Sequence, residues 1–283
     1  MIKGHCVCGR VSFEIAAALR QPSLCHCNQC RRIHGAPGAY TSAPASAFRI
    51  DGAENLGWHP TSARAEQGFC THCGAKLFWR EHGSPDLDVT MGSLVAPTSL
   101  RLDRHIFTRD QGDYYEIGRD ALPRYAQSSR DADPVRPQTA PDPGPARISH
   151  SGRCLCGAVK YRVAGKIRDV IACHCNLCQH LHGYAPSYCA ARKAEFAVEG
   201  EDNIAWYRSS AHARRGFCKD CGSTLFWWPE DRDTVSITAG SLDRPTGLKT
   251  VLHIMVAEKR DYYAIADGVP QMPDNSTADT VPF

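Results

Sequence analysis

The stretch CHCNQC at residues 25–30 places three cysteines and a histidine in six positions, and CHCNLC at residues 173–178 repeats it. The same offset relates GHCVCGRVSFEI at residues 4–15 to GRCLCGAVKYRV at residues 152–163. It also runs without a gap through most of each half of the chain. Self-similarity at one fixed offset is the mark of an internal repeat. The sequence therefore predicts a tandem duplication of one cysteine-rich domain.

The composition shifts between the two halves. Residues 126–150 read AQSSRDADPVRPQTAPDPGPARISH, which is rich in proline and almost without large apolar side chains. Such a segment cannot build a core and is typical of an extended linker. We expect a first copy at residues 1–125, a proline-rich linker at 126–148, a second copy at 149–272 and a disordered tail at 273–283.

Within each copy the pattern favours a mainly β fold. Short runs that alternate apolar and polar residues predict strands at 11–15, 76–79, 87–91, 105–107, 159–163 and 235–239. One helical turn or two is expected from Asn28 to His34, followed by Gly35 as the C′ residue, and from Asn176 to His182, followed by Gly183. The expected fold class is mainly β, a tandem pair of small domains pinned by zinc.

Fifteen cysteines in 283 residues need an explanation. The N-terminal MIKGHCVCGR lacks the apolar core of a secretory signal, so we expect a cytoplasmic protein whose thiols stay reduced and bind zinc instead of forming disulfides. The net charge of +3 comes without a basic run, which argues against nucleic acid as a partner. No apolar stretch reaches the length of a membrane span, so we expect no membrane partner.

The seven cysteines of each copy divide into four and three. A structural zinc takes four ligands in a closed tetrahedron, whereas a catalytic zinc takes three protein ligands and leaves a position for substrate. The CxC and CxxC pairs make the four-cysteine sets, and the CxCxxC runs make the three-cysteine sets. The four-cysteine sets are Cys6, Cys8, Cys70 and Cys73, and Cys154, Cys156, Cys218 and Cys221. The three-cysteine sets are Cys25, Cys27 and Cys30, and Cys173, Cys175 and Cys178. Two zinc ions per copy, and up to four per chain, are therefore expected.

An alternative closes the three-cysteine sets from within. His34 follows Cys30 by four residues and His182 follows Cys178 in the same way, so either histidine could supply a fourth ligand. His26 and His174, between two ligands, are expected to point away from the metal. If substrate sulfur instead takes the fourth position, Cys30 and Cys178 are the candidates for a ligand that moves off as it arrives. The fifteenth cysteine, Cys189, stands at the position that Thr41 occupies in the first copy, and no role is assigned to it.

The ordered motifs GxCxCGxV, CHCxxCRxxHG and GFCxxCGxxLFW resemble the glutathione-dependent formaldehyde-activating enzymes, relatives of centromere protein V. The resemblance covers nearly all of both copies. It implies a β-tent fold with one structural and one catalytic zinc per copy. It also implies a carbon–sulfur lyase that joins glutathione to formaldehyde as S-(hydroxymethyl)glutathione. Carried over by motif, the catalytic residues are Cys25, Cys27, Cys30, Cys173, Cys175 and Cys178, and the four-cysteine sets are structural.

The copies differ around these motifs. The first copy has Arg31/Arg32 where the second has Gln179/His180, and the second has Arg214/Arg215 where the first has Glu66/Gln67. The motif GSLDRP at residues 240–245 is GSLVAP in the first copy. Equal activity of the two halves does not follow from the sequence. The expected partner is a small-molecule thiol, with glutathione implied by the resemblance. The alternative is a non-catalytic zinc module that binds a thiol ligand or a protein.

Overall fold

A computed structural model of the chain describes residues 1–129 and 133–283. Each copy opens with a small antiparallel sheet. In the first copy β1 (Ile2–His5) pairs with β2 (Ser12–Ile15), which pairs with β5 (Phe48–Asp51). The second copy repeats this sheet with β11 (His150–Arg153), β12 (Lys160–Val163) and β15 (Phe196–Glu199). Alternate residues of β2 and β12 are buried, because successive side chains of a strand point to opposite faces of the sheet.

A seven-stranded sheet forms the larger layer of each copy, with the order β10-β3-β4-β9-β8-β7-β6 in the first and β20-β13-β14-β19-β18-β17-β16 in the second. The pairs β10/β3 and β20/β13 are parallel and the others are antiparallel. The first sheet comprises β3 (Ser23–Cys25), β4 (Gly38–Pro44), β6 (Leu56–Ser62), β7 (Ala65–Cys70), β8 (Lys76–Glu81), β9 (Asp86–Thr90) and β10 (Arg104–Ile106). The second comprises β13 (Arg168–Cys173), β14 (Ser187–Arg192), β16 (Ile204–Arg208), β17 (Ala213–Cys218), β18 (Thr224–Pro229), β19 (Thr234–Thr238) and β20 (Thr250–Ile254). The mainly β, duplicated fold is confirmed, and each predicted strand overlaps an observed one.

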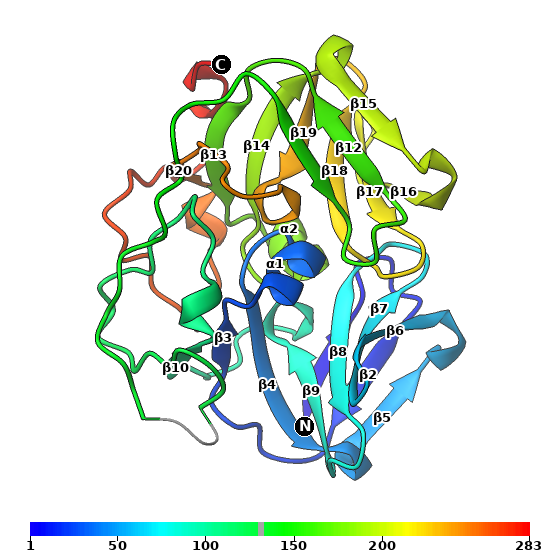
Figure 1. Cartoon of the computed structure of the whole chain (residues 1–283). Helices are drawn as coiled ribbons and strands as arrows, with labels where there is room; N and C mark the ends of the chain where they lie inside the picture. The colour runs from blue at the N-terminus through cyan, green and yellow to red at the C-terminus, as the bar shows by residue number, and fades with distance from the viewer. Residues whose placement is uncertain (130–132) are drawn as a thin grey trace.

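Each copy has one α-helix, α1 (Asn28–His34) or α2 (Asn176–His182), with the bounds that the sequence predicts. Gly35 ends α1 with a φ of 74°, a left-handed conformation that glycine adopts without strain, and its N–H donates to Arg31 O. The helices lie in the centre of the molecule, where the two copies meet (Figure 1). There α1 packs on the short 3₁₀ turn Ala239–Ser241 of the other copy, and α2 packs on Met91–Ser93. A Cβ atom on Gly240 would lie 2.1 Å from Arg31 O, which explains glycine in this turn.

The copies exchange a segment as well as packing together. Tyr114, from the first copy, is buried in the hydrophobic core of the second, and Tyr262 and Tyr263 are buried in the core of the first. Backbone hydrogen bonds fix the exchange: Thr250 N donates to Tyr114 O at 2.7 Å, and Leu102 N donates to Tyr262 O at 2.7 Å. Each core is therefore completed by its neighbour.

Polar contacts across this boundary explain two of the sequence differences between the copies. Arg32 donates from Nη1 to Ser241 O at 2.9 Å and to Arg153 O at 3.0 Å, and its Nη2 lies 2.8 Å from Asp243 Oδ1. The matching His180 bonds instead to His5 O through Nε2. Arg32 and the aspartate of GSLDRP are thus partners in one contact that joins the two copies.

The described residues include no helix that is long and apolar enough to cross a membrane. The last residues of the chain lie near the second copy, where Arg232 Nη1 is 2.6 Å from Asp279 Oδ1 in a short 3₁₀ turn, Ala278–Thr280. The boundaries proposed for the copies, the linker and the tail remain predictions.

Candidate metal centres

The four-cysteine sets come together in space. In the first copy, Cys6 and Cys8 lie in the turn after β1, Cys70 ends β7, and Cys73 lies in the turn that follows. The Sγ atoms of Cys6 and Cys8 are 3.4 Å apart and those of Cys8 and Cys70 are 3.7 Å apart. The second copy repeats both distances, 3.4 Å for Cys154–Cys156 and 3.7 Å for Cys156–Cys218. Each set joins the small sheet of its copy to the large one.

These distances suit a metal ion. Four sulfurs at about 2.3 Å from a tetrahedral zinc lie roughly 3.8 Å from each other, close to the observed spacing. A disulfide would need about 2.05 Å, and all fifteen cysteines are free. A backbone N–H also donates to one sulfur of each set, from Val11 to Cys6 and from Val159 to Cys154, both at 3.3 Å. The donor set and its spacing therefore fit zinc.

The three-cysteine sets lie at the start of each helix. Cys25 ends β3, Cys27 caps α1 and Cys30 lies in the first turn, where its N–H donates to Cys27 Sγ at 3.3 Å. The geometry repeats in the second copy, with 3.3 Å from Cys178 N to Cys175 Sγ. In both sets the sulfurs lie within 4.8 Å of one another. A CxxC pair that spans a helix start puts both sulfurs on one side, and the strand before it brings the third.

The histidines that could have closed these sets are engaged elsewhere. His34 bonds to His182 O through Nδ1 at 2.5 Å and to Tyr40 OH through Nε2 at 2.7 Å. His182 makes the matching bonds to His34 O and Tyr188 OH. Within the described residues, no histidine, aspartate or glutamate atom joins either three-sulfur group. Each copy thus holds one group of four sulfurs and one of three.

His26, between two cysteines, points away from them as expected. Its Nε2 lies 3.0 Å from His105 Nδ1, and its Nδ1 lies 2.8 Å from Tyr115 OH. His105 Nε2 in turn lies 2.8 Å from Asp120 Oδ2. Burial, followed by the nearby His105, holds the pKa of His26 well below its usual value, so the ring is neutral. This series of hydrogen bonds holds in place the backbone on either side of His26, which carries the cysteines.

The second copy repeats this chain with His174, His253, Asp267 and Tyr263. The sequence alone does not connect these tyrosines to the histidines. The matched spacing of these residues in both copies was the available signal, but it does not reveal which atoms meet.

A cavity of about 670 Å³ opens beside the three cysteines of the second copy. Arginines, aspartates, aromatic side chains and the end of the chain line it. Its lining includes Cys173, Cys175, Cys178, Arg168, Tyr188, Arg215, Trp227, Asp279 and Phe283. This cavity is large enough for a small peptide-like thiol and reaches the sulfur group directly.

Arg215 links the cavity wall to the sulfur group. This buried side chain donates from Nη2 to Cys178 Sγ at 3.4 Å and from Nη1 to Tyr188 OH at 2.9 Å. Hydrogen bonds from Cys173 and Cys175, together with the charge of Arg215, hold the pKa of the Cys178 thiol well below its usual value. The pKa values of Cys173 and Cys175 are raised instead, by hydrogen bonding among the three sulfurs and by burial, so Cys178 is the one of the three that favours thiolate, the form that binds metal.

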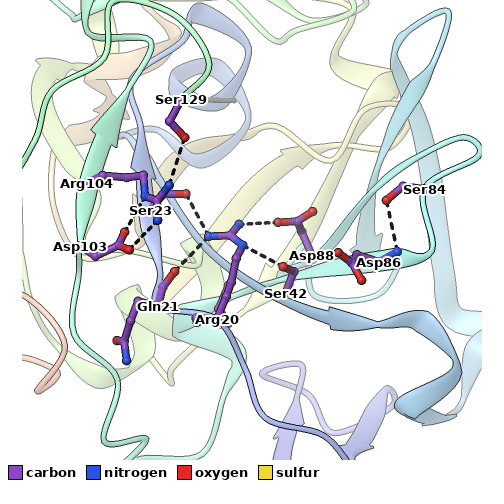
Figure 2. A network of polar contacts seen from close by, with 11 residues as sticks. Arg20, Gln21, Ser23, Ser42, Ser84, Asp86, Asp88, Asp103, Arg104 and Ser129 are labelled. Carbon is purple, nitrogen blue, oxygen red and sulfur yellow. Dashed lines mark hydrogen bonds and ion pairs between the residues drawn. The ribbon is translucent and has the colours of Figure 1, made fainter. Parts of the chain in front are cut away.

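The first copy differs at this position. Gln67 stands where the second copy has Arg215, and its Oε1 accepts from Tyr40 OH at 2.7 Å. Nearby, Arg20 Nη2 lies 2.7 Å from Asp88 Oδ1 and Arg20 Nε donates to Ser42 Oγ at 2.8 Å (Figure 2). The two three-cysteine groups thus have cysteines at the same matching positions, but the residues around them differ.

Known proteins resemble parts of the chain. A family profile described as "glutathione-dependent formaldehyde-activating enzyme" matches residues 1–110 and 149–258. An uncharacterized lyase of Schizosaccharomyces pombe is 25% identical over 119 residues, which is 42% of this chain and 86% of that protein. A crystal structure of a Rhodobacter sphaeroides protein is 28% identical and covers 34% of this chain and 91% of that one, with a TM-score of 0.30.

Proposed function

Because the chain belongs to the family of glutathione-dependent formaldehyde-activating enzymes, in two tandem copies, we propose that it is a zinc-dependent carbon–sulfur lyase. It joins a thiol such as glutathione to formaldehyde or a related small carbonyl. The catalytic residues are the three-cysteine groups, Cys25, Cys27 and Cys30, and Cys173, Cys175 and Cys178. The observation that supports this most is the contrast between four converging sulfurs and three in each copy.

The four-cysteine groups are the structural zinc sites in this proposal. They are Cys6, Cys8, Cys70 and Cys73, and Cys154, Cys156, Cys218 and Cys221. With the three-cysteine groups, they give up to four zinc ions per chain. A zinc ion on a three-cysteine group would supply a fourth position for the substrate sulfur and favour its thiolate.

The reaction is an addition without change of oxidation state. The substrate sulfur forms a bond to the carbonyl carbon, the carbon–oxygen π bond breaks, and the oxygen takes up the proton that the thiol lost. A free thiol has a pKa of about 8.5, so only a small fraction is thiolate at neutral pH. In the second copy, Arg215 offsets the negative charge that three thiolates bring together, through its contact with Cys178.

The cavity of the second copy contributes by holding the reactants. Its wall beside the sulfurs includes Tyr188 and Trp227, which limit how a bound thiol can lie. Holding two small reactants side by side removes much of the entropic barrier to their addition. A cytoplasmic location, where glutathione is abundant and thiols stay reduced, suits fifteen unbridged cysteines.

Cobalt substitution tests the proposal, because the visible bands of cobalt report the number and type of its ligands. Titration of glutathione into cobalt-loaded protein should change the bands of the three-cysteine sites and leave those of the four-cysteine sites as they are. A Cys27→Ser/Cys175→Ser double variant should lose the response, and formation of S-(hydroxymethyl)glutathione should stop with it.

Bands that ignore glutathione and other small thiols at millimolar concentration would contradict the proposal. The protein would then be a non-catalytic zinc module for a protein partner. Bands that respond without any catalysis of adduct formation would instead indicate a thiol-binding module.

A further inference from the structure

We propose that Arg168 forms an anion subsite in the cavity of the second copy, which selects thiols that carry a carboxylate, and that the first copy lacks this subsite. The inference rests on the proposed function, because it assumes that a thiol binds at Cys173, Cys175 and Cys178. The inference names Arg168 as the residue that decides which thiols bind. It also predicts that the two copies differ in the charge of the thiols they prefer.

Arg168 lines the cavity and has few partners of its own. Its one hydrogen bond within the described residues runs from Nη2 to Tyr188 O at 3.2 Å, and its buried Nε has no partner there. No described carboxylate lies within ion-pair distance. The carboxylates nearest in charge effect are engaged elsewhere: Asp279 pairs with Arg232 at 2.6 Å, and Asp169 Oδ1 accepts from Lys249 N at 3.0 Å.

An arginine in this state favours a ligand of opposite charge. Burial lowers the pKa of Arg168 from its usual value, which reflects the cost of holding the cation away from water. A carboxylate would relieve that cost, because the guanidinium can give it two parallel hydrogen bonds. The same cavity reaches the three sulfurs, so one molecule can present a thiol at one end and a carboxylate at the other.

Arg215, one of the two other arginines that line the cavity, has a different task. Arg215 already contacts Cys178 Sγ at 3.4 Å and Tyr188 OH at 2.9 Å. Its charge therefore offsets the sulfur group. Arg232, the other arginine of the lining, is paired with Asp279 at 2.6 Å, which leaves Arg168, at the backbone side of Tyr188, to meet the substrate.

The first copy supplies its own anion for the matching arginine. Arg20 occupies the position of Arg168, and Asp88 occupies that of Ser236. Ser42 and Asp88 face each other across β4 and β9, and Ala190 and Ser236 face each other at the same register of β14 and β19. Figure 2 shows Arg20 held by Asp88, Ser42 and Gln21, a full set of partners that Ala190 and Ser236 do not reproduce. Arg20 is paired with Asp88 and Gln67 is neutral, so neither position that matches an arginine of the second-copy cavity offers an unpaired cation.

Two thiols that differ by one carboxylate charge and one methyl group test the subsite: 3-mercaptopropionate and its methyl ester. Their dissociation constants are measured by calorimetry on full-length, zinc-loaded protein. Cys27→Ser isolates the second copy and Cys175→Ser isolates the first. In the second copy the acid should bind about tenfold or more tighter than the ester, the usual effect of one charge-assisted hydrogen-bond pair. In the first copy the ratio should be close to one.

Three substitutions should move this ratio in stated directions. Arg168→Gln and Ser236→Asp should both bring the ratio in the second copy close to one, the latter by copying the pair that Arg20 and Asp88 already make. Asp88→Ser should raise the ratio in the first copy by freeing Arg20. Zinc content and thermal melting of each variant establish that it is folded, and Ser236→Asp keeps the inference testable if Arg168→Gln does not fold.

The outcomes separate this inference from the proposed function. Equal binding of acid and ester by the second copy overturns the subsite and leaves thiol binding intact. A preference for the acid that survives both Arg168→Gln and Ser236→Asp overturns the role of Arg168. Failure of both thiols to bind removes the proposed function and the inference together.

Discussion

Arg32 allows a test of how the two copies hold together. Arg32→Met keeps the apolar stem of the side chain but removes its two hydrogen bonds to backbone carbonyls and its contact with Asp243. The Arg32 side chain is 8% exposed and that of Asp243 is 41% exposed, so the carbonyl bonds should dominate and the ion pair should add less. At about 1–1.5 kcal/mol for each carbonyl bond and less than 1 kcal/mol for the pair, the loss is about 3 kcal/mol.

Thermal melting of zinc-replete, full-length protein measures this loss. For a chain of this size, about 3 kcal/mol corresponds to a fall in the melting midpoint of roughly 6 °C or more. Asp243→Asn keeps an acceptor oxygen and should cost about 1 kcal/mol or less. Arg10→Met, at an exposed position, should leave the midpoint where it is. An Arg32→Met midpoint within 1 °C of wild type would refute the role of these bonds in joining the copies.

Three further predictions concern the metal sites and the buried histidines. Freshly purified, zinc-replete protein should contain up to four zinc ions by metal analysis and keep about two after mild chelation; only two at the start would remove the case for catalytic zinc. Cys6→Ser or Cys154→Ser should unfold its copy, as followed by circular dichroism, whereas Cys27→Ser or Cys175→Ser should melt like wild type and lose thiol binding. If Cys27→Ser or Cys175→Ser also unfolded its copy, the zinc ions of the three-cysteine sites would be structural. Burial lowers the pKa of His34 to about 4 and of His182 to about 3, so the unfolded chain takes up protons first as pH falls. The stabilising effect of the neutral histidines should be full above about pH 6.5 and decline from there toward pH 4. The melting midpoint of a His34→Gln/His182→Gln variant should fall less steeply with pH. Equal slopes of midpoint against pH in variant and wild type would contradict the role of these two histidines.

The sequence predicts the parts of this protein that depend on local spacing. The helix bounds follow from Gly35 and Gly183, because only a residue that tolerates a positive φ ends a helix in this way. The family and the duplicated β fold follow from the ordered cysteine motifs, and the structure groups the sulfurs as four and three. These features need only neighbours along the chain, or ligands that a metal must gather.

Contacts between strands and between copies could not be predicted in the same way. Arg20 and Arg168 are arginines at matching positions, but only Arg20 has a carboxylate partner. That partner, Asp88, is replaced by Ser236 in the second copy and lies far along the chain on another strand. The sequence also does not reveal that Tyr114 is buried in the core of the other copy. In a repeat, the pattern that predicts a tyrosine in one core fits the other core equally well. Only the three-dimensional arrangement decides between the two.

The exchanged tyrosine segments make the molecule equivalent to a homodimer whose two subunits have been joined into one chain. Each half donates a strip of chain to its neighbour and receives the same strip in return, so neither half has a complete core when alone. In a dimer of identical subunits, every substitution appears twice. Here both halves belong to one chain, which removes that constraint, so one pocket can change its charge while the other keeps its own. The protein can thus evolve two specificities inside a single symmetric scaffold.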